Sequence, residues 1–279
     1  MRVFRKISEL RQFISEQRFL NKSIGFVPTM GALHSGHSEL LRVARNQSDI
    51  VVCSIFVNPT QFNNQEDLIN YPRTTDRDIE LLKAVECDAL FLPEADEIYK
   101  EETRLKFNFG WLESTMEGLH RPGHFNGVAV VVSKLFHIVN PDFAYFGQKD
   151  LQQLAIIKQL VKDLSFPVSI ISVPTVRESS GLAKSSRNER LSIEGKNIAA
   201  HINKSLAQLE SQLLSGISFD EYKSESINYL KDKGIEVEYL ELVDSETMKA
   251  VSNKLNDNSV ALCIAAVVEG IRLIDNRIF

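Results

Sequence analysis

Two histidines, His34 and His37, stand three residues apart in segment 28–37, PTMGALHSGH, and their spacing gives the clearest indication of chemistry. Residues 24–27 form a short apolar run typical of a buried parallel strand, and residues 39–44 repeat apolar side chains at helical spacing. Both histidines therefore fall at the start of a helix, where backbone N–H groups and the helix dipole attract an anion. The segment predicts a nucleotide-phosphate site.

Two glycines in the same segment support this prediction. Gly31 and Gly36 lack the side chains that would keep a phosphate away from the backbone. The alternative is a purely structural histidine pair at the helix start. The apolar strand and the PTMG residues that precede the pair favour the phosphate site.

Cationic residues next to small or polar ones mark two further segments. In 146–150, FGQKD, Gly147 permits close backbone approach, Lys149 supplies a point charge for phosphate and Asp150 can accept hydrogen bonds from ribose hydroxyls. In 181–188, GLAKSSRN, a lysine and an arginine accompany two serines, a combination that suits a triphosphate and a loop that closes over it. Alternatively, both segments are solvated loops, with Asp150 capping the next helix.

Side-chain amides follow another strand in segment 54–62, SIFVNPTQF. Asn58 and Gln61 lie where the strand ends, and their amides can bind a hydroxyl or a carboxylate. The alternative makes Asn58 a turn former and Gln61 a surface residue. In RPGH, Arg121 and His124 surround two turn-forming residues, which indicates a pocket rim or a subunit contact.

Two acidic residues begin a later helix. Asp76 and Asp78 fall in the first turn after an N-cap at Thr74 or Thr75, where carboxylates favour the helix dipole. A magnesium role through water is the alternative for this pair.

The first two-thirds of the chain alternate short apolar strands with helical patterns, as in a parallel sheet with helices on both faces. Strands are predicted at 24–29, 50–57, 89–92, 143–146 and 168–173, and helices at 39–46, 76–85, 128–139 and 151–164. Right-handed crossovers then bring the carboxyl ends of the strands, and the loops after them, to one edge.

The pattern changes after about residue 175. Helices are predicted at 193–214 and 219–233, and strands at 237–243, 260–268 and 271–274, with a turn at 256–258. We therefore expect an α/β protein with a Rossmann-like parallel-sheet domain at 1–175 and a smaller α+β lid domain at 176–279.

Composition narrows the class of protein. The chain has 279 residues and a net charge of −5, which argues against binding of nucleic acid. The apolar run 260–268 is far shorter than the ~20 residues of a membrane span, and the N-terminus lacks an export signal, so we expect a cytoplasmic protein. Cys53, Cys87 and Cys263 are widely separated, and the pattern of Cys53 and Cys263 is that of small buried apolar residues.

Together these segments closely resemble the pantoate–β-alanine ligase (pantothenate synthetase) family of the nucleotidylyltransferase superfamily. The matching runs are PTMGALHSGH, SIFVNPTQF, YPRT, RPGHFNGV, FGQKDLQQL and VPTVRESSGLAKSSRN, with RLIDN near the C-terminus. The resemblance implies a cytoplasmic homodimer that uses ATP with Mg²⁺. Such an enzyme condenses (R)-pantoate with β-alanine through an enzyme-bound pantoyl adenylate, and releases pyrophosphate and AMP.

The resemblance also assigns residues to substrates. The residues that would contact ATP are Met30, Gly31, Ala32, Leu33, His34, Ser35, Gly36, His37, Gly147, Gln148, Lys149, Asp150, Val176, Lys184, Ser185, Ser186 and Arg187. Pantoate would contact Gln61, Gln153 and Asn58. The catalytic groups would be His34, His37, Lys149 and Arg187, with His37 as the proton donor and Val176 contacting adenine through its backbone. The family pattern leaves the metal ligands unknown.

Three positions depart from the family pattern. Gln148 stands where glutamate is common, Lys184 where methionine or leucine is common, and Arg77 where an acidic residue can occur. Two rival functions stay open at this point. One is a nucleotidylyltransferase that keeps AMP on its product, and the other is a nucleotide sensor without turnover.

Overall fold

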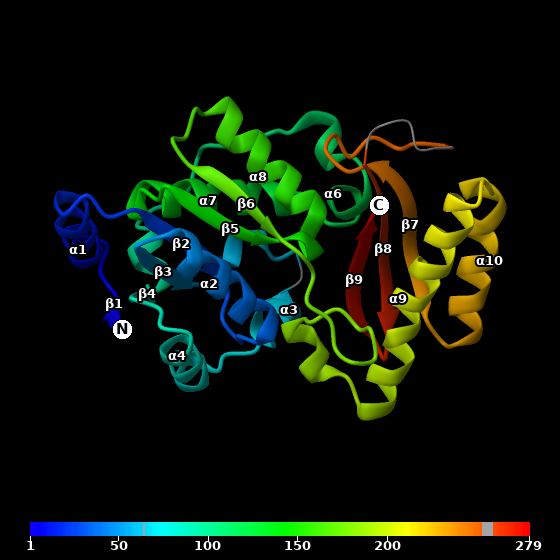
Figure 1. Cartoon of the computed structure of the whole chain (residues 1–279). Helices are drawn as coiled ribbons and strands as arrows, with labels where there is room; N and C mark the ends of the chain where they lie inside the picture. The colour runs from blue at the N-terminus through cyan, green and yellow to red at the C-terminus, as the bar shows by residue number, and fades with distance from the viewer. Residues whose placement is uncertain (64, 253–258) are drawn as a thin grey trace. The chain divides into compact units, whose positions relative to one another are not determined.

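A computed structural model describes residues 1–63, 65–252 and 259–279 and divides into two compact units (Figure 1). The N-terminal unit comprises Met1–Gln148 and Ile156–Pro174, and the C-terminal unit comprises Lys149–Ala155 and Thr175–Phe279. The turn predicted at 256–258 lies outside the described residues. Within the described residues, no helix is both long and apolar enough to cross a membrane.

A six-stranded parallel sheet organises the N-terminal unit. Its strands, in spatial order, are β1 (Arg2–Phe4), β4 (Ala89–Phe91), β3 (Ile50–Ile55), β2 (Ile24–Thr29), β5 (Phe143–Gly147) and β6 (Ser169–Val173). The chain runs outward in one direction from β2 through β3 to β4 and in the other from β5 to β6. The strand order therefore reverses between β2 and β5, which is the place where open α/β sheets bind ligands.

Helices cover both faces of this sheet. Phe26 of β2 packs against Phe136 of α7 (His124–Val139), whereas the neighbouring Val27 packs in a cluster with Leu40 and Leu41 of α2 (Ser35–Gln47). Since successive strand residues point to opposite faces, α2 and α7 lie on opposite faces of the sheet. The remaining helices of this unit are α1 (Ile7–Phe19), α3 (Gln65–Ile69), α4 (Thr75–Ala84), α5 (Ala95–Ile98), α6 (Met116–His120) and most of α8 (Leu151–Asp163).

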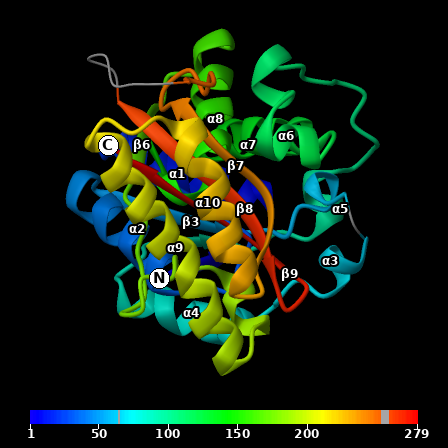
Figure 2. The same ribbon diagram turned by 90° about the vertical axis from the view of Figure 1, so that its right-hand side faces the viewer.

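The C-terminal unit pairs two helices with a three-stranded antiparallel sheet. The sheet consists of β7 (Glu236–Asp244), β8 (Val260–Val268) and β9 (Ile271–Ile278). Figure 2 shows α9 (Ile193–Leu214) and α10 (Phe219–Asp232) side by side over this sheet. Leu209, Leu230 and Ile264 are buried and form part of the core of this unit.

Most predicted elements are present, and their differences have local causes. The predicted helix 128–139 begins earlier, at His124, and the predicted strand 271–274 continues to Ile278 because β8 pairs with its whole length. The predicted strand 50–57 ends at Ile55, since Asn58 caps a 3-10 turn at Pro59–Gln61. The mixed α/β architecture with a parallel sheet and a separate antiparallel sheet confirms the predicted fold class.

Candidate active site

The loop after β2 is held by a buried carboxylate from α4. Asp78 is only 1% exposed and accepts hydrogen bonds from the backbone N–H of Ala32 at 2.9 Å and of Leu33 at 2.8 Å. It also accepts from the hydroxyl of Thr74 at 3.0 Å. The prediction that Asp78 serves the dipole of its own helix was therefore incomplete, because both carboxylate oxygens bind the loop at 30–34. Sequence reasoning missed this positioning role.

The same loop has an unusual backbone. Gly31 has φ of 84°, and Ala32 also lies in the left-handed region with φ of 49°. A non-glycine residue in this region costs on the order of 1–2 kcal/mol, so the Asp78 contacts offset strain at Ala32. With this backbone conformation, the loop leads directly into the first turn of α2.

His34 and His37 form a reciprocal cap at the start of α2. His34 Nδ1 accepts from the Gly36 N–H at 3.1 Å, and His37 Nδ1 accepts from the His34 N–H at 3.3 Å. The ring centroids are 4.1 Å apart. A neutral imidazole whose Nδ1 accepts carries its proton on Nε2. Each ring can therefore donate a hydrogen bond through Nε2 while its Nδ1 caps the start of α2.

Asn58 and Gln61 lie in a buried loop after β3. Asn58 is 1% exposed and Gln61 is 8% exposed, so the surface alternative for Gln61 is wrong. Asn58 Nδ2 donates to Gln61 Oε1 at 3.1 Å, and Asn58 Oδ1 accepts from the Tyr99 hydroxyl at 2.8 Å. The two amides form one hydrogen-bonded unit.

Gln61 joins this loop to the histidine loop. Its Nε2 lies 2.9 Å from the sulfur of Met30, so the loops after β2 and β3 lie side by side at the carboxyl edge of the sheet.

The backbone oxygen of Gln61 contacts His124 Nδ1 at 2.9 Å, and His124 is 5% exposed. The ring of His124 is therefore buried and supports the backbone of Gln61, and the pocket rim or subunit contact stays a prediction for this segment. Gly127 of the same helix packs so closely that a Cβ would lie 2.3 Å from the Thr60 oxygen.

The segment after β5 has open space at its glycine. A Cβ placed on Gly147 would meet no protein atom within 4 Å. Gln148 and Lys149 are half-buried and Asp150 is exposed in the short 3-10 turn η3 (Gln148–Asp150). Gln153 follows, half-buried, in the first turns of α8.

The predicted triphosphate loop of the C-terminal unit forms a small hairpin. Arg177 and Ala183 form an isolated β-bridge, and the Lys184 N–H donates to the Val176 oxygen at 2.9 Å. Ser185 caps the 3-10 turn η4 (Ser186–Arg190) by accepting from the Arg187 N–H at 3.3 Å. The hairpin therefore leads directly into the segment of Ser186 and Arg187.

Lys184, a departure from the family pattern, has a defined partner. Its Nζ lies 3.2 Å from Glu178 Oε1, and both side chains are half-buried. The ammonium is therefore paired within the hairpin, and the pair is partly exposed to solvent.

The magnesium alternative concerns the two acidic residues in the first turn of α4, Asp76 and Asp78. Within residues 1–63, 65–252 and 259–279, no group of three or more His, Cys, Asp or Glu could hold a metal ion. Asp76 is exposed, and Asp78 binds backbone N–H groups with both oxygens. The magnesium alternative for Asp78 thus competes with its contacts to the loop.

The fold and the loops at its sheet edge define a nucleotide-binding α/β protein, with a histidine-capped helix start where the strand order reverses and buried amides beside it. Comparisons with known proteins narrow this class. The profile of the family described as pantoate-beta-alanine ligase matches residues 2–278. The chain is 50% identical over 274 residues to pantothenate synthetase of Cytophaga hutchinsonii, covering 98% of this chain and 97% of that protein. It is 45% identical over 280 residues to that of Porphyromonas gingivalis, covering 99% and 98%.

Solved structures agree. Pantothenate synthetase from Thermus thermophilus aligns with a TM-score of 0.89 at 39% identity, covering 99% of each chain. Pantoate-beta-alanine ligase from Francisella tularensis, complexed with beta-gamma ATP and beta-alanine, aligns with a TM-score of 0.85 at 37% identity, covering 99% of this chain and 97% of that chain. The chain belongs to the pantoate–β-alanine ligase family. It is an ATP-dependent ligase that joins (R)-pantoate to β-alanine and forms pantothenate, AMP and pyrophosphate.

Proposed function

We propose that the ligase reaction begins with attack of the pantoate carboxylate on the α-phosphorus of ATP, which forms pantoyl adenylate and pyrophosphate. The carboxylate is already ionised at neutral pH, so this step requires alignment and charge stabilisation and no base. His34 and His37 donate hydrogen bonds through Nε2 to the α-phosphoryl oxygens and keep their ring protons. Lys149 and Arg187 balance the charge of the triphosphate, which is present in bound ATP and remains on the leaving pyrophosphate.

The reciprocal cap of His34 and His37 is the observation that carries this proposal. The two rings lie 4.1 Å apart at the N-terminal end of α2, an arrangement that suits a phosphoryl group that gains negative charge.

We assign the rest of the nucleotide to the other predicted segments. Met30, Gly31, Ala32, Leu33, Ser35 and Gly36 contact the phosphates, Gly147, Gln148 and Asp150 contact ribose and phosphate, and the Val176 backbone contacts adenine. Ser185, Ser186 and Lys184 contact the triphosphate. Lys184 makes this contact while its ammonium stays paired with Glu178, since the two groups are 3.2 Å apart.

We assign the amide loop, which contains Asn58 and Gln61, to the binding of pantoate and β-alanine. Gln61, Asn58 and Gln153 hold the hydroxyls and carboxylate of pantoate, and Gln61 lies next to the β-alanine site. Since Asn58 and Gln61 are buried and already bonded to each other, their geometry is set before substrate binds. The neutral amine of β-alanine then attacks the carbonyl carbon of the adenylate, which forms the amide bond, breaks the bond from that carbon to the phosphate oxygen and releases AMP, and the nitrogen loses one proton.

Mg²⁺ enters this scheme with ATP. Magnesium usually keeps several waters and binds through substrate phosphates. Because the described residues contain no acidic cluster for a metal, we propose that the substrate is the MgATP complex.

The two domains have different roles in this proposal. Residues 1–175 bind the nucleotide and pantoate, residues 176–279 act as the lid, and the protein is a cytoplasmic homodimer. Light scattering of the purified chain measures that oligomeric state.

Product analysis tests the reaction. With ATP and pantoate alone, the enzyme should release pyrophosphate but little AMP, and addition of β-alanine should release AMP and pantothenate in equal amounts. AMP that stays attached to the final product would contradict the proposed second step, and would instead support the nucleotidylyltransferase alternative.

A further inference from the structure

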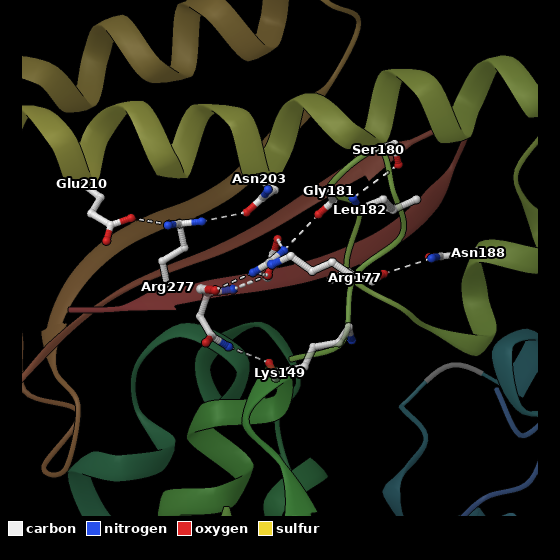
Figure 3. A network of polar contacts seen from close by, with 12 residues as sticks. Lys149, Arg177, Ser180, Gly181, Leu182, Asn188, Asn203, Glu210 and Arg277 are labelled. Carbon is white, nitrogen blue, oxygen red and sulfur yellow. Dashed lines mark hydrogen bonds and ion pairs between the residues drawn. The ribbon is translucent and has the colours of Figure 1, made fainter. Parts of the chain in front are cut away.

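The end of β9 carries a buried polar network that connects two cationic segments of the C-terminal unit (Figure 3). Asp275 and Asn276 are 5% and 3% exposed. One side of the network contacts the segment of Lys149, and the other side contacts the hairpin that leads to Arg187. Neither Asp275 nor Asn276 has a role in the substrate assignments above.

Asn276 binds the backbone of Lys149. Its Nδ2 donates to the Lys149 carbonyl oxygen at 2.8 Å, across 127 positions in the sequence. This contact restrains the Lys149 backbone, and with it the Cα from which the side chain extends, independently of the contacts that the side chain makes.

Asp275 binds the hairpin through Arg177. The guanidinium donates to both carboxylate oxygens, at 2.6 and 2.9 Å, in a bidentate ion pair. The same guanidinium donates to the Gly181 oxygen at 3.2 Å and to the Asn276 oxygen at 3.1 Å. One arginine therefore bonds the tip of the hairpin and the end of β9 together.

A hydrogen bond connects the hairpin to the segment that contains Arg187. Asn188 Nδ2 donates to the Ala183 oxygen at 3.0 Å, so the 3-10 turn that contains Arg187 is bonded back to the residue that forms the β-bridge with Arg177. A continuous chain of hydrogen bonds thus runs from the Lys149 carbonyl through β9 to the turn of Arg187.

We propose that Asn276, together with Asp275, is a positioning residue for ATP binding, because it holds Lys149 and the Arg187 segment in one fixed arrangement before the nucleotide arrives. This inference rests on the proposed function, in which Lys149 and Arg187 contact the same triphosphate. Two cations fixed in advance lose less freedom when they bind phosphate, so the network should act on ATP affinity more than on the rate constant.

Asn276→Ala isolates one contact of the network. The substitution removes the amide that binds Lys149, but it retains the Asn276 backbone N–H and oxygen that bind Asp275 and Arg177. The assay is isotope exchange between pyrophosphate and ATP in the presence of pantoate at varied ATP. We expect the KM for ATP to rise about tenfold, the scale of one lost hydrogen bond, with kcat within about twofold.

A double variant shows whether Asn276 acts through Lys149. Lys149→Met should impair exchange more than Asn276→Ala does, and the double variant should match Lys149→Met within about twofold, since residues in one network are not additive. Glu210→Gln is the matched control. It weakens the ion pair of the adjacent Arg277 with α9 and should leave the KM for ATP unchanged.

The outcomes separate the two proposals. If Lys149→Met exchanges normally, the assignment of Lys149 in the proposed function is wrong and this inference falls with it. If Lys149→Met is impaired but the two single effects multiply, or if Glu210→Gln raises the KM equally, then Asn276 only stabilises β9 and the inference alone is overturned. Should Asn276→Ala fail to unfold cooperatively on heating, Asn276→Leu, which has a similar size, carries no charge and lacks the donor, is judged by the same criteria.

Discussion

Two segments assigned to the phosphates of ATP are held by buried carboxylates, but in different ways. In the N-terminal unit, Asp78 binds the backbone N–H groups of Ala32 and Leu33 directly. In the C-terminal unit, Asp275 acts on its loop through the guanidinium of Arg177. The first carboxylate shapes the loop itself, whereas the second fixes a hairpin that already has its own backbone hydrogen bonds.

This difference predicts two kinds of defect. A change near Asp78 distorts the backbone that carries the histidines, so the rate of the chemical step should fall. A change near Asp275 leaves the hairpin formed but less well placed, so the affinity for ATP should fall instead. Kinetics that separate kcat from KM are therefore the measurement that distinguishes the two regions.

The histidines should give the largest effect. We expect His34→Ala and His37→Ala each to slow pyrophosphate exchange by about 10²–10³, the scale of one preorganised donor removed from a transition state. The KM for ATP should change less than kcat. His137→Ala, at an exposed histidine on α7, serves as the control and should exchange normally. Normal exchange in both active-site variants would refute the catalytic role of the pair.

Asp78→Ala should give the next largest effect. It leaves two buried N–H groups without their acceptor, so the free energy of unfolding should fall by about 3 kcal/mol. Exchange should slow by about 10², since displacement of the histidines by about 1 Å has that cost. Asp76→Ala is the matched control in the same turn of α4, and its exposed side chain predicts little change in either property. Equal effects of the two variants in denaturant unfolding and exchange would contradict the loop-shaping role.

The contrast between these aspartates also shows where sequence reasoning stops. The strand before the histidines, the helix after them and the position of the histidines at the helix start were predicted because each depends on neighbouring residues. The partners of Asp78 lie more than 40 positions away, at Ala32 and Leu33, and only the fold brings them together. The sequence signal at Asp78 was an acidic residue in a first helical turn, which local rules explain without any distant contact.

The same limit applies to the C-terminal unit. The motif containing Lys184 and Arg187 was evident from its composition, but Asn276 contacts Lys149 across 127 positions. RLIDN was identified only as a final strand. Polar residues inside an apolar strand were the signal that could have indicated a buried network, because a buried aspartate and asparagine require partners.

Gly147→Ala tests close approach of the nucleotide without disturbing the fold. The added Cβ meets no protein atom within 4 Å, and φ lies outside the left-handed region, so the free energy of unfolding should stay the same or rise by about 0.4–1 kcal/mol. If ribose or phosphate lies against this backbone, the KM for ATP should rise about tenfold. The KM for pantoate provides the internal control. A variant with wild-type ATP affinity would remove Gly147 from the nucleotide site.

Lys184→Met should give the smallest effect. It tests whether the hairpin depends on the ion pair between Lys184 and Glu178. The pair with Glu178 is partly exposed, so its loss should cost no more than about 1 kcal/mol in unfolding. Because the bidentate Arg177 pair and the backbone bond from Lys184 N–H to Val176 remain, the hairpin should keep its shape. We expect the KM for ATP to change by about twofold. Glu178→Gln, the matched partner variant, frees the same ammonium without removing it. A rise in KM of tenfold or more in Lys184→Met but not in Glu178→Gln would mean that the ammonium leaves Glu178 and binds the triphosphate with its full charge.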